Sequence, residues 1–224
     1  MSYKDPTRKV GSQKEIPSIK DTLNTISVSG YQKFTIDKSS LIIKSNAKFE
    51  IIDKILKKII YKTSFCDIGC SSGIVSILAY KNNFNNITAI DHDSEYTNIL
   101  KQINDKLNIK NINVITDSFG NDINKYDVVF CGAIIHWIWS LTSNFDSFEK
   151  IFNYLNNITN KILLIEWVDI NDQALNSFGH ITKNKENYKT INFETTLIKY
   201  FKIIDKIEAT CPTRIIYIAE KYHH

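Results

Sequence analysis

Apolar residues first recur at helical spacing between residues 46 and 61. Phe49, Ile52, Ile55 and Ile59 would share one face of a helix there. This segment is the first strongly periodic one in the chain, and a different pattern follows it.

From residue 63 onward, short apolar runs alternate with amphipathic segments. The runs are nearly continuous, as expected of strands that are buried on both faces. The predicted strands are residues 63–68, 86–91, 112–116, 126–131 and 161–168. The predicted helices are residues 73–81, 94–107, 146–157, 171–178 and 192–201. Strands that alternate with helices favour a mostly parallel sheet with helices on both faces.

The last two predicted strands, residues 203–209 and 214–220, break the alternation. The segment between them, residues 210–213, is too short for a helical crossover, so these strands should form an antiparallel hairpin. A dinucleotide-binding domain would continue with parallel strands instead. We therefore predict an α/β, Rossmann-like domain whose seven-stranded, mostly parallel sheet ends in an antiparallel C-terminal hairpin.

Residues 1–45 lack this periodicity. Residues 1–20 contain two of the three prolines and are interpreted as a loose arm. Tyr31 and Gln32, ahead of the first helix, are predicted to fold over a bound ligand as a lid. The chain is therefore divided into an N-terminal arm and lid, residues 1–45, and one folded domain, residues 46–222.

The composition fits one soluble domain. A chain of 224 residues with 43% hydrophobic content can bury one sizeable core. No run reaches the ~20 apolar residues that a membrane span needs, and no secretory signal is present. We therefore expect no membrane partner and a cytoplasmic location, in the host cytoplasm if the source is viral.

Charge and cysteine content exclude further classes of function. The net charge of +4 comes from scattered lysines, which does not predict a nucleic-acid partner. Cys66, Cys70, Cys131 and Cys211 fit neither a zinc site nor a CxxC pair. They are predicted to be free thiols, and no metal site is predicted.

The segment with the strongest chemical signal is residues 67–73, Asp-Ile-Gly-Cys-Ser-Ser-Gly. A strand ends there and a helix begins. Glycine permits a positive φ and close approach of a ligand, and the N–H groups at the helix start point toward it. We predict ligand contacts from Asp67, Gly69, Ser71 and Gly73. The alternative is an ordinary strand–turn–helix connection.

Two further carboxylates stand at the ends of the next two predicted strands, Asp91 as the last residue of one and Asp117 just after the other. Asp91 lies 18 residues beyond Gly73, where a carboxylate can accept hydrogen bonds from both ribose hydroxyls. Asp117 is placed to meet an adenine amino group. Nicotinamide dinucleotide sites use the same acidic residue, so that class stays open here. The predicted nucleoside contacts are Asp91, His92, Asp117, Ser118 and Phe119.

With these features in order, the chain resembles the class I family of methyltransferases that use S-adenosylmethionine (SAM). The resemblance covers residues 46–220 and rests, besides the closing hairpin, on Asp67, Gly69, Gly73, Asp91 and Asp117. It implies SAM as methyl donor, S-adenosylhomocysteine (SAH) as product, and SN2 transfer to an acceptor held over the fourth and fifth strands. Ser71 replaces the middle glycine of the family's DxGxGxG pattern.

More loosely, the chain is similar to methyltransferase domains that O-methylate sugars in viral or bacterial glycans. That similarity rests on four short motifs, Ser29-Gly30-Tyr31-Gln32, Ile165-Glu166-Trp167, Gly179-His180-Ile181 and Thr213-Arg214-Ile215-Ile216-Tyr217.

The segment after the fourth strand lies beside the transferable methyl group in the class I family. Cys131-Gly132 stands there, and Gly132 is a predicted cofactor contact. The family's submotifs for amino-methylating nucleic-acid enzymes, RNA ribose methyltransferases and metal-dependent catechol-type enzymes are absent. His136 follows instead, and an imidazole with its ordinary pKa of about 6.5 suits a general base.

Glu166, at the end of the fifth strand, is the second predicted catalytic residue. It is placed to orient His136, to bind sugar hydroxyls or to act as the base itself. The predicted acceptor contacts are Tyr31, Trp137, Trp139, Trp167 and His180. For the aromatic residues, packing in the core or the lid is the alternative.

The sequence thus predicts a SAM-dependent O-methyltransferase that acts on a hydroxyl of a small molecule or a sugar or glycan. Three alternatives remain: an RNA methyltransferase on the same fold, a non-catalytic SAM-fold partner subunit, and a nicotinamide-dependent oxidoreductase. The acceptor and the oligomeric state stay undetermined at this point.

Overall fold

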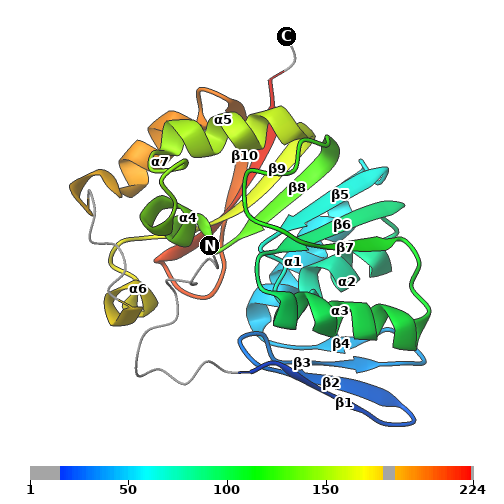
Figure 1. Ribbon diagram of the computed structural model, residues 1–224. Helices are drawn as coiled ribbons and strands as arrows, with labels where there is room; N and C mark the ends of the chain where they lie inside the picture. The colour runs from blue at the N-terminus through cyan, green and yellow to red at the C-terminus, as the bar shows by residue number, and fades with distance from the viewer. Residues whose placement is uncertain (1–15, 179–184, 223–224) are drawn as a thin grey trace.

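A seven-stranded sheet forms the centre of the computed structural model, which describes residues 16–178 and 185–222 (Figure 1). Its strand order is β10-β11-β9-β8-β5-β6-β7. The strands are β5 (Ser64–Ile68), β6 (Asn86–Asp91), β7 (Ile112–Thr116), β8 (Tyr126–Gly132), β9 (Thr159–Val168), β10 (Phe201–Glu208) and β11 (Arg214–Lys221). Within the group β5 to β9, every pair of neighbouring strands is parallel. Strand β11 is antiparallel to both β9 and β10. The predicted α/β fold with a C-terminal hairpin is confirmed.

Helices cover both faces of this sheet (Figure 1). On one face lie α1 (Ala47–Lys58), α2 (Ile74–Lys81) and α3 (Ser94–Leu107). On the other lie α4 (Ile135–Leu141), α5 (Phe148–Ile158), α7 (Thr190–Leu197) and a residue of α6 (Gln173–Phe178). A 3-10 helix spans Lys185–Asn187. Helix α4 falls on a segment to which the sequence pattern assigned no element.

The alternation of side chains along β9 shows why its sequence is apolar throughout. Ile162 and Leu164 belong to the core on the α1 side, and Leu163 and Ile165 to the core on the α5 side. Successive strand residues point to opposite faces, so a central strand needs apolar residues at every position. The same parity places Glu166 on the α1 side.

Residues 18–44 form a second sheet, so residues 18–20 are part of a strand and not of a loose arm, whereas residues 1–15 lie outside the described residues. Four antiparallel strands pair in sequence order, namely β1 (Ser18–Asp21), β2 (Thr25–Ser29), β3 (Phe34–Asp37) and β4 (Ile43–Lys44). Ile26, Val28, Phe34 and Ile36 are buried in the core shared with α1, α2 and α3. The division at residue 46 stays a prediction.

We expect replacement of Ile36 by alanine to lower the free energy of unfolding by about 2–4 kcal/mol, because its side chain is fully buried. The matched control is Ile42→Ala in the connection between β3 and β4, where the side chain is 53% exposed and the loss should stay within about 0.5 kcal/mol. Urea denaturation measures both. Equal losses would show that the small sheet is not packed on the helices.

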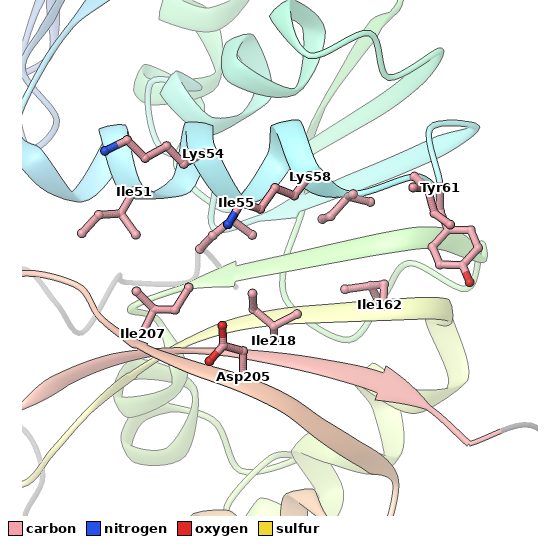
Figure 2. A pocket seen from close by; sticks show the side chains of 11 residues that line it. Ile51, Lys54, Ile55, Lys58, Tyr61, Ile162, Asp205, Ile207 and Ile218 are labelled. Atoms are coloured by element: carbon pink, nitrogen blue, oxygen red, sulfur yellow. The ribbon is translucent and has the colours of Figure 1, made fainter.

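A cavity of about 520 Å³ lies between α1 and the strands β9, β10 and β11. Figure 2 shows isoleucines of α1 facing Ile207 and Ile218, with Lys54, Lys58 and Asp205 around them. None of the predicted site residues lines it. Within the described residues, no helix is long and apolar enough to cross a membrane.

Candidate active site

The turn between β5 and α2 requires its glycines. Gly69 and Gly73 have φ angles of 73° and 85°, in the left-handed region. A Cβ atom on Gly69 would lie 2.7 Å from Cγ2 of Ile134, and one on Gly73 would lie 2.4 Å from Cδ1 of Leu100. Ser71 is also left-handed, at φ 49°, which costs a non-glycine residue about 1–2 kcal/mol. Strain of this kind is typical of functional sites.

Asp91 holds this turn from the neighbouring strand. Its Oδ2 accepts a hydrogen bond from the Ser71 N–H at 2.8 Å, and its Oδ1 accepts one from the Asp93 N–H at 3.0 Å. His92 lies beside it, with Nδ1 3.4 Å from Oδ1. A carboxylate offers about four lone-pair sites, so acceptor capacity remains for two hydroxyl groups.

Asp117 lies next to Asp91 because its N–H donates to the Asp91 carbonyl oxygen at 3.0 Å. Its Oδ1 accepts hydrogen bonds from the N–H of Ser118 and from the Asn121 amide. The ring of Phe119 packs edge-on against Phe145 and Tyr154, so the aromatic ring predicted to face adenine belongs to a small aromatic cluster.

A second strained turn lies beside the first. Ile68 and Cys131 are paired in the sheet, so the residues that follow them are neighbours. Gly132 has no room for a side chain, since a Cβ atom there would lie 2.5 Å from Cε1 of Phe130. Ala133 has a φ of 52°, and the next residue packs on Gly69. Left-handed backbone therefore follows two adjacent strands, β5 and β8, at the same edge of the sheet.

The residues at this edge fit an adenosyl ligand with a charged amino-acid end. Ser71 Oγ and Ser72 Oγ are buried and have no hydrogen-bond partner among the described residues. Buried hydroxyls without partners are costly and call for a bound group. The turn would hold the amino-acid end, and Asp91 would hold the ribose.

His136 is the second residue of α4, directly after the strained turn at Ala133. Its side chain is 5% exposed, and its ring lies edge-on to Trp137 with 5.1 Å between the ring centroids. Trp137 is half-buried. Both residues therefore lie at the carboxyl edge of the sheet, where the sequence placed them.

Glu166 stands opposite Gly132 in the register of β8 and β9. It is fully buried, and its Oε2 accepts a hydrogen bond from Lys48 Nζ at 3.1 Å. Arg214 Nη1 lies 3.9 Å from its Oε1. This side chain lies on the α1 face, whereas α4 packs on the other, so the predicted role of orienting His136 is not supported.

A family model for ribosomal protein L11 methyltransferases (PrmA) matches residues 46–196. The chain belongs to this family. A search of the curated proteins found no match to the sequence.

Solved structures of methyltransferases share the fold. Magnesium protoporphyrin IX methyltransferase from Synechocystis PCC 6803, with bound SAH, is 15% identical with a TM-score of 0.61, over 79% of this chain and 84% of that one. N-methyltransferase NodS from Bradyrhizobium japonicum WM9, in complex with SAH, is 10% identical with a TM-score of 0.62, over 79% and 86%. Ribosomal protein L11 methylase from Lactobacillus delbrueckii subsp. bulgaricus is 15% identical with a TM-score of 0.56, over 80% and 81%.

These findings confirm the predicted class I methyltransferase fold and SAM as the cofactor. The nicotinamide-dependent alternative is thereby excluded. The individual contacts of Asp91, Asp117 and the glycine turn with SAM stay predictions, supported by the geometry described above.

Two tryptophans of this methyltransferase are not where an acceptor could stack on them. Trp167 is 1% exposed, its ring is stacked on Tyr188, and its Nε1–H donates to Thr190 Oγ1 at 2.9 Å. Trp139 is buried against Phe148. The prediction that they bind the acceptor is therefore wrong, because both belong to the α5-side core.

The two remaining acceptor contacts that the sequence predicted are Tyr31 and His180. Tyr31 is 64% exposed in the turn between β2 and β3, and its N–H donates to the Tyr96 hydroxyl on α3 at 3.4 Å. This contact places the turn beside the first turn of α3, close to the end of β6. His180 lies outside the described residues.

The buried thiols of the methyltransferase are not nucleophiles. Burial raises the pKa of Cys66, Cys70 and Cys131, so these thiols stay protonated at neutral pH. All four cysteines are free, as predicted.

The side chain of Asp67 is directed toward α2. It is 1% exposed, and its Oδ2 accepts a hydrogen bond from the Ser76 hydroxyl at 2.6 Å. Burial raises the pKa of Asp67 to about 7, against the opposing effect of the Ser76 hydrogen bond. Its role is therefore to fix the first turn of α2 beneath the glycine turn.

The raised pKa predicts how Asp67→Asn changes stability with pH. Because the folded pKa of about 7 lies above the ordinary 3.8, Asp67 loses stabilising effect as pH rises from about 4 to 7. Relative to wild type, the asparagine variant should gain on the order of 4 kcal/mol between pH 4 and pH 8. Urea denaturation at several pH values measures this difference, and a constant difference would contradict the assignment.

Sequence reasoning did not find Lys48, Asp172 and Arg214 as residues of this edge. Lys48 looks like any exposed helix lysine, and its partner Glu166 is 118 residues away. Arg214 belongs to one of the short motifs that are similar to those of glycan O-methyltransferase domains. Nothing in the sequence spacing indicated that it pairs with Asp172.

Proposed function

We propose that this methyltransferase transfers the methyl group of SAM to a hydroxyl of a small molecule or a sugar, with His136 as the general base. The observation that carries the proposal is the state of the other titratable groups described at this edge. Glu166 is ion-paired with Lys48, Asp67 is bonded to Ser76 beneath the turn, and the thiols are protonated. The imidazole of His136 is the group that suits proton removal.

The positively charged sulfur of bound SAM makes its methyl group electrophilic, so the protein need not supply a nucleophile. The turn and Asp91 hold the donor in one orientation, and correct placement of two reactants contributes several kcal/mol. Bound SAM would supply the methyl group and leave as SAH, and His136 would take the proton from the acceptor hydroxyl. General-base assistance of this kind contributes about 10²–10⁴-fold.

Formation of SAH is the test, measured with methyl glycosides, phenols, purified ribosomal protein L11 and RNA as acceptors. Turnover of a glycoside or a phenol supports the proposal. Turnover of the protein or the RNA alone would reject hydroxyl transfer to a small molecule.

A protein acceptor is the second candidate, because the matching family model is that of ribosomal protein L11 methyltransferases. An RNA acceptor is disfavoured by the carboxylates at this edge, Asp91, Asp93, Asp117 and Asp169, which would repel phosphates.

A further inference from the structure

Four charged side chains meet where β9 ends and β11 begins, and we name them the Glu166 cluster. It consists of Lys48, Glu166, Asp172 and Arg214. Arg214 donates from Nε and Nη2 to the two oxygens of Asp172, both at 3.0 Å. Lys48 donates to Glu166, whose side chain has no exposed surface. The cluster has two positive and two negative groups.

One atom of this cluster is left without a hydrogen bond. Glu166 Oε1 has no partner among the described residues. Arg214 Nη1 lies 3.9 Å away, which is too far for a hydrogen bond. A buried carboxylate oxygen in this state is costly, since a buried charge needs both pairing and hydrogen bonds.

The cluster lies at the right distance from the cofactor turn to hold an acceptor. Glu166 is opposite Gly132 in β8, and β8 neighbours β5, which ends at the turn. Two strand spacings separate Glu166 from Gly69, roughly 10 Å. An acceptor of one ring can bridge that span.

We propose that the Glu166 cluster binds the methyl acceptor and selects a polyhydroxylated ring, that is, a sugar. One hydroxyl would accept a hydrogen bond from Arg214 Nη1 and donate one to Glu166 Oε1. With ordinary distances of about 2.9 and 2.7 Å, the two bonds meet at roughly 90° across the gap, which an oxygen accommodates. This inference rests on the proposed hydroxyl transfer.

The charges of the cluster argue against other acceptors. A phosphate or carboxylate would be repelled by Glu166 and Asp172. An ammonium group would be repelled by Lys48 and Arg214. An apolar group would leave Glu166 Oε1 without a partner, which costs about 1–3 kcal/mol or more. A hydroxyl both donates and accepts, so it satisfies both sides of the gap.

Saturation-transfer NMR on the SAH-loaded protein tests the proposal. The probes are the methyl glycosides of glucose, galactose, mannose, fucose and rhamnose, with tetrahydropyran, phenol and phenethylamine as comparison ligands. We expect a glycoside to bind and Glu166→Gln to weaken it at least tenfold. The affinity for SAH should change less than twofold. Glu50→Gln, on the exposed side of α1, is the matched control and should bind like wild type.

The proposal is overturned if no glycoside binds the wild-type protein, or if Glu166→Gln binds as well as wild type. If Glu166→Gln fails to fold, Arg214→Lys is the second test. This change keeps the positive charge and removes the bidentate guanidinium contact within the cluster. Arg214→Lys should also weaken glycoside binding at least tenfold, and unchanged binding would overturn the proposal.

The same panel separates this proposal from the proposed function. If a glycoside binds through Glu166 but neither a glycoside nor a phenol is methylated, the cluster remains a sugar site and hydroxyl transfer is rejected. Methylation of phenol without glycoside binding rejects the cluster's role and leaves hydroxyl transfer intact.

Discussion

Asp91→Ala is expected to raise the Kd for SAM at least about 100-fold. The change removes the acceptor of the Ser71 N–H, which is 2.8 Å away, and of the Asp93 N–H, which is 3.0 Å away. The glycine turn thus loses its tether, and the ribose loses its predicted partner. Two hydrogen bonds to a charged group are each worth about 1.5–3 kcal/mol, which sets the scale of the loss. Isothermal titration with SAM measures it.

Asp105→Ala, on the exposed side of α3, is the matched control and should leave the Kd unchanged. Asp91→Asn separates the two roles, since an amide oxygen can still accept from Ser71 but carries no charge. Its Kd should lie between those of wild type and Asp91→Ala. Tight binding of SAM by Asp91→Ala would remove this residue from the site.

His136→Ala is expected to lower kcat by about 10²–10⁴-fold while the Kd for SAM stays within twofold of wild type. The side chain lies after the strained turn at Ala133 and not in the turn that holds the donor. The loss should therefore appear in turnover alone. Rates of SAH formation with the acceptor found by the panel, together with titration, measure both quantities.

His136→Gln tests whether the loss comes from lost packing or from the lost base. Glutamine fills much of the same volume but cannot take a proton at neutral pH, so its kcat should fall as far as that of alanine. If either variant kept the full rate, Glu166 would become the preferred base, in spite of its ion pair with Lys48.

The main sheet was predictable because its strands are buried on both faces and read as apolar runs. The small sheet was not, since β1 to β4 have two to five residues each and only β2 and β3 bury alternate side chains. Ile26 with Val28, and Phe34 with Ile36, carry the alternation, but two residues are too few to set a period. Tertiary contact with α1 to α3 decides their structure.

The site residues, too, include some that were predictable from the sequence and some that were not. The glycine turn and Asp91 were predictable because the turn directly follows one strand, Asp91 ends the next, and neighbouring parallel strands end at one edge. Trp139 and Trp167 were misjudged because helix α4 and the inward face of β9 turn them into the core. In the Glu166 cluster, Lys48 and Glu166 are 118 positions apart, so their pairing is a property of the folded chain.

A crystal structure of the protein with SAM tests the central claim most directly. The account predicts the nucleoside at the β5–α2 turn, with both ribose hydroxyls within hydrogen-bond distance of the Asp91 carboxylate and the amino-acid end at Ser71 and Ser72. A nucleoside bound elsewhere, or a turn left without ligand at saturating SAM, would contradict it.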